Sequence, residues 1–181
     1  MQRLEILNVS IACLDQAGLV AQALDWAESP GRRVIHYANA HSLNLACEQP
    51  AFCDLLNAAD LIYADGVSLS WAACLLHRQR LEKLTGADWL DPLCAGAALR
   101  GLRLYLLGGR PGIAEKAAQN LLQRHPSLKI VGTADGFFQQ RSPAAIAEEI
   151  AHLQPQLVLV GLGAPLQEHW IAKWKAALPA G

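Results

Sequence analysis

Five short loops of the sequence carry glycine or a small polar residue directly after an apolar run. They are Asn39, Asp65-Gly66, Gly108-Gly109, Asp135-Gly136 and Gly161-Leu-Gly163. If the apolar runs are parallel strands, these loops lie outside the carboxyl ends of the strands, where open α/β sheets bind ligands. Glycine lets backbone N–H groups approach a phosphate, and a helix N-terminus that follows favours its charge. The loops therefore predict a site for a phosphorylated ligand.

The glycine pair has a simpler alternative. Leu107-Gly-Gly-Arg-Pro-Gly112 leads into a helical pattern, as a phosphate loop would, but glycine pairs also mark ordinary tight turns. The stretch is neither a GxGxxG fingerprint nor a GxxxxGK[ST] loop. A Rossmann dinucleotide-binding protein and a P-loop NTPase are therefore disfavoured.

Asp65 is the strongest catalytic candidate by position, because it ends an apolar strand and precedes Gly66. Its carboxylate could take a proton from a hydroxyl nucleophile. The alternatives are an Asp-Gly turn, or an N-cap for a helix over 67–76. Asn39 leaves a similar choice: its amide could orient a substrate, or it could cap the next helix.

Other reactive groups give weaker patterns. His36 and His41 have no third ligand near them in the sequence, and no Asp-x-Asp occurs. We therefore expect no metal and no cofactor, so backbone amides, helix dipoles and cations would have to neutralise a bound diphosphate. No Ser lies in a GxSxG motif. Four tryptophans occur at helical spacing and are expected in the core or at an interface: Trp71, Trp89, Trp170 and Trp174.

The positioning elements alternate between strands and helices. Strands are predicted at 34–38, 61–64, 102–107, 129–133 and 157–160. Helices are predicted at 16–28 after an Asp15 cap, at 41–48, 51–58, 67–76, 111–124 and 165–178, and from 143 after a Ser142 cap. Residues 4–14 predict a strand or hairpin. This order predicts a Rossmann-like α/β fold with a mostly parallel sheet and helices on both faces. We expect one domain over 1–181, with two lobes meeting near residue 100 as the alternative.

Composition limits the function classes. Of 181 residues, 52% are hydrophobic and 17% charged, with net charge −1, which excludes disorder and makes nucleic acid an unlikely partner. Five cysteines without a CxxC pair suit buried free thiols in a reducing cytoplasm. Neither a signal peptide nor a membrane span is apparent. The apolar excess predicts an uncovered patch that mediates self-association or membrane contact.

Seven stretches, taken in order, resemble the WecG/TagA/CpsF family of bacterial glycosyltransferases. The stretches are Tyr37-Ala-Asn-Ala-His41, Ala59-Asp-Leu-Ile-Tyr-Ala-Asp-Gly66, Leu84-Thr-Gly-Ala-Asp88, Leu104-Tyr-Leu-Leu-Gly-Gly-Arg-Pro-Gly112, Pro126-Ser-Leu-Lys-Ile-Val-Gly132, Asp135-Gly-Phe-Phe138 and Val160-Gly-Leu-Gly-Ala-Pro-Leu-Gln-Glu168. Each motif alone is weak, but the seven occur in the same order as in the family and together extend over nearly the whole chain.

The resemblance implies an inverting, metal-independent transferase that moves an N-acetylmannosamine-type sugar or related hexose. The implied donor is a UDP-sugar, and the acceptor is a polyprenyl-diphosphate-linked sugar at the cytoplasmic membrane face, for cell-wall or capsular polysaccharide. It implies Asp65 as general base. The implied substrate-binding set is Tyr37, Asn39, Lys83, Asp88, Gly108, Gly109, Arg110, Gly136, Gly161, Gly163 and Gln167.

Three positions depart from the family pattern. Tyr37 replaces the usual Thr, Lys83 replaces the usual Arg and so loses bidentate phosphate geometry, and Leu166 replaces a Lys. The family also continues beyond the position that matches Gly181, with a basic, aromatic tail thought to contact the membrane. Two alternatives therefore stand beside the enzyme: a non-catalytic UDP-sugar-binding or assembly subunit, and an unrelated nucleotide-binding enzyme.

Overall fold

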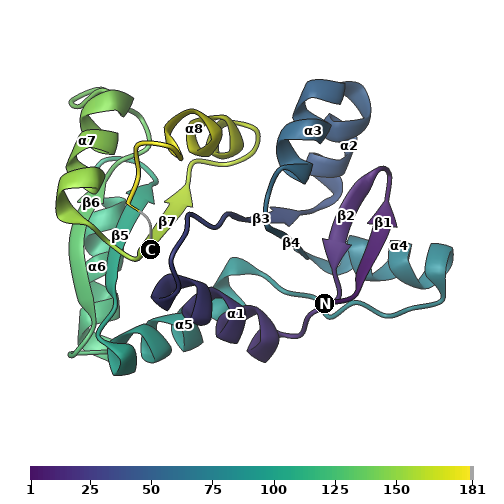
Figure 1. The fold of residues 1–181 in the computed structure, drawn as a ribbon, viewed down its shortest axis with the longest axis horizontal. Coiled ribbons are helices and arrows are strands. Elements are labelled where there is room, and N and C mark those ends of the chain that lie inside the picture. Colours follow the sequence, from purple (N-terminus) through teal and green to yellow (C-terminus); the bar gives the residue numbers. More distant parts are fainter. Residues whose placement is uncertain (180–181) are drawn as a thin grey trace. The chain divides into compact units, whose positions relative to one another are not determined.

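The computed structural model describes residues 1–179, which divide into two compact units. The N-terminal unit comprises Met1–Ala23 and Arg33–Leu90, and the C-terminal unit comprises Leu24–Arg32 and the chain from Asp91. Helix α1 (Gln16–Glu28) runs from the first unit into the second, and Asp15 caps it by accepting the Gly18 N–H at 2.7 Å, as predicted. The elements are labelled in Figure 1.

The N-terminal unit holds a hairpin and a parallel strand pair. Strands β1 (Arg3–Ile6) and β2 (Val9–Ala12) pair antiparallel around Leu7 and Asn8, whose positive φ angles suit a tight hairpin turn. Strands β3 (Ile35–Ala38) and β4 (Leu61–Ala64) pair in parallel. Helices α2 (Ala40–Glu48) and α3 (Pro50–Asn57) connect them. Hairpin, strands and both helices bury one apolar core that includes Ile11, Phe52 and Ile62.

After β4 the chain forms two more helices. Helix α4 (Val67–His77) follows Gly66, and α5 (Gly86–Arg100) continues into the C-terminal unit. The sequence pattern did not predict α5, which contains Pro92. Proline lacks the N–H that an internal helical residue donates, so Pro92 weakens the sequence signal for a helix here.

The C-terminal unit is a three-stranded parallel sheet in the order β6-β5-β7. Its strands are β5 (Arg103–Gly108), β6 (Lys129–Ala134) and β7 (Leu157–Gly161), linked by α6 (Ile113–Arg124) and α7 (Pro143–Leu153), and α8 (Leu166–Trp174) follows. The chain moves from β5 to β6 and then crosses back beyond β5 to β7. With right-handed crossovers, this reversal places α6 and α7 on opposite faces of the sheet.

The core of the C-terminal unit agrees with that placement. Tyr105 and Leu107 pack on one face with residues of α7 and with Trp170 of α8. Leu104 and Leu106 alternate with them and are buried on the other face, while α6 contacts both β5 and β6. The predicted fold class, Rossmann-like α/β with helices on both faces of a parallel sheet, is confirmed.

Several sequence expectations need correction. The parallel strands form two separate sheets within residues 1–179 instead of one. Pro111 lies in the turn before α6, and α8 ends at Trp174 instead of Leu178. Of the four tryptophans expected in the core or at an interface, Trp170 is buried, and Trp71 is 70% exposed, which is compatible with an interface alone. All five cysteines are free, yet Cys47 and Cys74 are exposed.

Candidate functional site

The parallel pairing of β3 and β4 brings Asn39 and Asp65 together. Ala38 lies opposite Ala64 in the register, and the next residue of each strand is Asn39 and Asp65. The Asp65 N–H donates to the Ala38 carbonyl at 2.8 Å, and Asn39 Nδ2 donates to Asp65 Oδ2 at 3.3 Å. A carboxylate and a carboxamide therefore share the carboxyl edge of this sheet.

Asn39 takes one of its two predicted roles, the helix cap, and its role in orienting a substrate stays a prediction. Its Oδ1 accepts the Ser42 N–H at 3.0 Å, and its own N–H donates to Ser42 Oγ at 2.8 Å, which is a capping box for α2. Because Oδ1 faces a backbone donor, Nδ2 is the group that turns toward Asp65. The cap thus fixes the orientation of the amide at the site.

Asp65 does not cap the following helix. Gly66 is the N-cap of α4, with φ 87°, and no side chain caps this end. Asp65 instead forms an isolated parallel bridge with Leu84, and its side chain is half-buried beside Asn39. The geometry therefore excludes the N-cap alternative, and the role of Asp65 as a base stays a prediction.

An aromatic cluster lies on the same strands as this pair. Tyr37 and Tyr63 are register partners two residues before Asn39 and Asp65, so they share a sheet face with them. Their ring centroids are 6.3 Å apart, and Trp89 of α5 meets Tyr63 edge-on at 6.0 Å. Burial, with a smaller effect of Asp65, raises the pKa of Tyr63, so its phenol stays neutral.

Lys83 and Asp88 lie in the segment that follows α4. Lys83 is exposed and directly precedes Leu84, the bridge partner of Asp65. Asp88 Oδ2 accepts hydrogen bonds from the Thr85 N–H and from Thr85 Oγ1, both at 2.8 Å, at the start of α5. These bonds lower the pKa of Asp88. The contacts of Asp88 are thus those of a helix-capping residue, and its assignment to substrate stays a prediction.

In the C-terminal unit the predicted glycine loops converge at the end of β5. Gly109 N–H donates to the Gly161 carbonyl at 3.4 Å, and Gly136 N–H donates to the Gly109 carbonyl at 2.9 Å. A Cβ on Gly108 would lie 2.3 Å from the Gly161 oxygen, so the two backbones approach more closely than side chains permit. The strand order reverses here, between β5 and β7, which is where open α/β sheets bind ligands.

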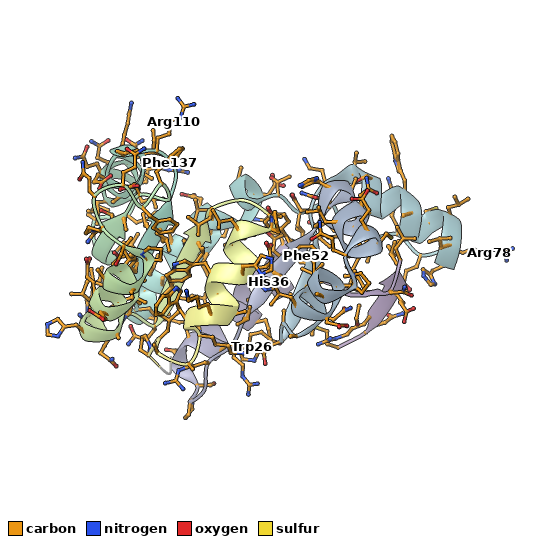
Figure 2. The ribbon with its side chains drawn as sticks, turned by 90° about the horizontal axis from the view of Figure 1, so that it is seen from above. Trp26, His36, Phe52, Arg78, Arg110 and Phe137 are labelled. Atoms are coloured by element: carbon orange, nitrogen blue, oxygen red, sulfur yellow. The ribbon has the colours of Figure 1, made fainter. Side chains whose placement is uncertain are left out.

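The loop after β7 is tied to Gln167. Gln167 Oε1 accepts the Gly163 N–H at 3.2 Å, and the Gln167 N–H donates to the Gly163 carbonyl at 3.0 Å. Arg110 of the loop after β5 and Phe137 of the loop after β6 are both exposed, and both are labelled in Figure 2. The α6 N-terminus beyond Arg110 has Gly112 as N-cap and receives no hydrogen bond from a capping side chain.

Sequence reasoning missed Glu168 as a site residue. Its side chain is 0% exposed, its Oε1 accepts from Gln167 Nε2 at 3.0 Å, and its Oε2 has no hydrogen-bond partner among the described residues. Burial raises the pKa of Glu168 above the ordinary value of 4.5. The available signal was its place beside Gln167 in Pro165-Leu-Gln-Glu168.

This raised pKa predicts a stability that depends on pH. As pH rises past about 4.5, Glu168 ionises in the unfolded chain before it does in the folded protein, so the free energy of unfolding falls until the folded pKa is passed. Glu168→Gln cannot ionise, so its free energy of unfolding should not show this decline. Urea unfolding between pH 4 and 8 measures it. The control Glu148→Gln alters an exposed carboxylate of α7 and should keep the wild-type slope; a wild type without the decline would contradict the prediction.

Neither a cluster of metal ligands nor a membrane-spanning helix occurs in the part of the chain that the structure describes. Among residues 1–179, no three His, Cys, Asp or Glu side chains gather as metal ligands. In the same residues, no helix combines the length and hydropathy needed to cross a bilayer. His36 is buried in β3 and His41 is exposed on α2.

The fold and these loops define an α/β protein with a carboxylate at one sheet edge and a glycine-lined switch point in another sheet. The chain matches the glycosyl transferase WecG/TagA/CpsF family over residues 4–181 and belongs to it. A Bacillus subtilis (strain 168) relative, named N-acetylglucosaminyldiphosphoundecaprenol N-acetyl-beta-D-mannosaminyltransferase, is 26% identical over 146 residues. The match covers 81% of this chain and 56% of the relative, so the chain spans little more than half of that protein.

Proposed function

We propose that this chain carries out inverting transfer of an N-acetylmannosamine-type sugar or related hexose from a UDP-sugar to a polyprenyl-diphosphate-linked sugar. The observation that carries the proposal is the Asp65–Asn39 pair at the carboxyl edge of β3 and β4. Family membership and the name of the B. subtilis relative support the reaction class and the acceptor. The product would serve cell-surface polysaccharide synthesis.

Asp65 would act as the general base. Asn39 donates to Oδ2, which leaves Oδ1 to take the proton of the acceptor hydroxyl. The hydroxyl oxygen forms the new bond to the anomeric carbon as the bond from that carbon to the UDP oxygen breaks, and the electron pair leaves with UDP. A single displacement of this kind inverts the anomeric configuration. It requires positioning and one base, which can contribute about 10²- to 10⁴-fold in rate.

The C-terminal unit would hold the UDP. Gly108, Gly109 and Gly136 allow the close backbone approach at the switch point. Gly161 and Gly163 add no side chain there, and the α6 N-terminus offers uncapped amides to phosphate. Gln167, held by Gly163 and Glu168, would orient the nucleotide or the sugar.

A cation completes the proposed donor site. Arg110 of the C-terminal unit is exposed and can supply positive charge to the diphosphate, and Lys83 of the N-terminal unit is an exposed cation that stays in the proposed substrate-binding set. We propose that the chain uses Arg110, with backbone amides, in place of a divalent cation. Asp88 and Tyr37 stay in the proposed substrate-binding set, with Tyr37 adding a phenol near the Asn39 side of the sheet.

A panel of radiolabelled UDP-sugars with a short-chain polyprenyl-diphosphate-linked acceptor tests this proposal. We expect one donor to give a lipid-linked product, equally in the presence of Mg²⁺ and of EDTA. Loss of product in EDTA would refute metal independence. Absence of product with every donor would refute the activity.

Tyr37 and Lys83 favour a second candidate, a non-catalytic UDP-sugar-binding or assembly subunit, because both lie near Asp65 and differ from the family pattern. Titration calorimetry separates the two functions. The subunit would bind a UDP-sugar yet give no product with any acceptor, whereas the enzyme binds and turns over. With either function, we propose that the chain lies in the cytoplasm, peripherally on the inner face of the membrane, where lipid-linked acceptors reside.

A further inference from the structure

Helix α4 has an exposed face that is apolar along its length. Val67, Trp71 and Leu75 are 48%, 70% and 84% exposed, and Cys74 beside them is also exposed. These positions follow the spacing i, i+4, i+7 and i+8, so they form one stripe along the helix. We call these four residues the α4 stripe. No charged residue occurs between Gly66 and Leu76.

The opposite face of α4 explains why the helix is stable without burying this stripe. Leu69 and Ala73 are buried in the core of the N-terminal unit. Ser70 Oγ donates to the Leu81 carbonyl at 2.6 Å, and the ring of His77 contacts the Glu5 carbonyl at 2.7 Å. This face thus holds α4 to the N-terminal unit, and burial of the α4 stripe is not needed to stabilise the helix.

Basic side chains gather where the stripe ends. Arg78, Arg80 and Lys83 follow within six residues of His77, all three are exposed, and the nearest acidic residue in this run is Glu82. Figure 2 shows Arg78 extending from the end of α4. An exposed apolar stripe with tryptophan, ending in a cluster of cations, is the pattern of a helix that lies in the interface of an anionic membrane.

We propose that the α4 stripe and the Arg78–Arg80 end of this helix dock the N-terminal unit onto an anionic lipid surface. Charge complementarity argues for this occupant, since Arg78, Arg80 and Lys83 outnumber Glu82 at this end and match an anionic surface. The consequence for catalysis rests on the proposed function: α4 begins one residue after Gly66, so docking brings Asp65 to the lipid surface that holds the acceptor.

Vesicle flotation of the full chain tests the docking without any transfer reaction. We expect co-flotation with vesicles that contain phosphatidylglycerol, weaker binding to pure phosphatidylcholine, and release by high salt. Trp71→Ser with Leu75→Ser should lower partitioning by about tenfold or more. Arg78→Asn with Arg80→Gln should lower binding to the anionic vesicles alone. The control Leu99→Ser removes a leucine of α5 that is 90% exposed and should bind like wild type.

Two further measurements separate the possible failures. Transfer to a short-chain, water-dispersed acceptor should be unchanged in Trp71→Ser/Leu75→Ser, because neither residue is assigned to the site. If the wild-type protein does not transfer sugar to this acceptor, the proposed function is refuted, and the flotation result is not affected. Wild-type flotation by the double variant would overturn the docking proposal. A change from dimer to monomer in sedimentation, without a change in flotation, would also overturn it and assign the α4 stripe to a second copy.

Discussion

Asp65→Asn should slow sugar transfer by about 10²- to 10⁴-fold while donor binding persists, the size of effect that a general base contributes. An amide has the shape of the carboxylate but cannot take the proton of the acceptor hydroxyl. Its oxygen can still accept from Asn39 Nδ2, so the sheet edge should keep its geometry. Initial rates with saturating donor measure the loss, and calorimetry with the UDP-sugar measures the retained affinity.

Asp54→Asn is the matched control, because Asp54 is an exposed carboxylate on α3 of the same unit. It makes the same change of atoms and charge away from the site, so its rate should equal that of wild type. Asp65→Asn at the wild-type rate would remove Asp65 from the chemistry. Loss of both rate and donor affinity in Asp65→Asn would instead assign the carboxylate to substrate binding.

The N-terminal half of the site could be predicted because parallel pairing obeys a simple rule. Strands predicted at 34–38 and 61–64 correspond closely to β3 and β4, and equal register then places the residues after them side by side. What the sequence could not decide was the role of each group. Asn39 as cap or as amide donor depends on which atom meets Ser42, and that is a matter of three-dimensional orientation.

Other features depended on tertiary contacts that leave little trace in the sequence. Glu168 is a charged residue in the first turn of α8, so the sequence alone predicts that it lies at the surface. The surrounding residues nevertheless bury it completely. The helical spacing of Trp71 allowed a place in the core or at an interface, and the core of the N-terminal unit takes the opposite face of α4. Which apolar face a helix buries is decided by its neighbours, and both faces of α4 are apolar.

Gly108→Ala should destabilise the protein by about 3–5 kcal/mol and abolish donor binding. Gly108 has a φ of +145°, a conformation that L side chains rarely adopt, and its added methyl would lie 2.3 Å from the Gly161 oxygen. Neither β5 nor β7 can yield easily, because they are register partners along Leu104–Gly108 and Leu157–Gly161. Thermal unfolding should show a midpoint lower by roughly 10 °C or more.

Gly161→Ala is the control for this effect, since it adds the same methyl to the other strand of the same close approach. There the nearest atom to the new Cβ is the Leu107 oxygen at 3.8 Å, an ordinary contact, and φ is not positive. Its stability should stay within about 1 kcal/mol of wild type. If Gly108→Ala instead unfolds at the wild-type temperature, the loops after β5 and β7 do not meet backbone to backbone. The switch point would then lack the closeness on which the proposed diphosphate site depends.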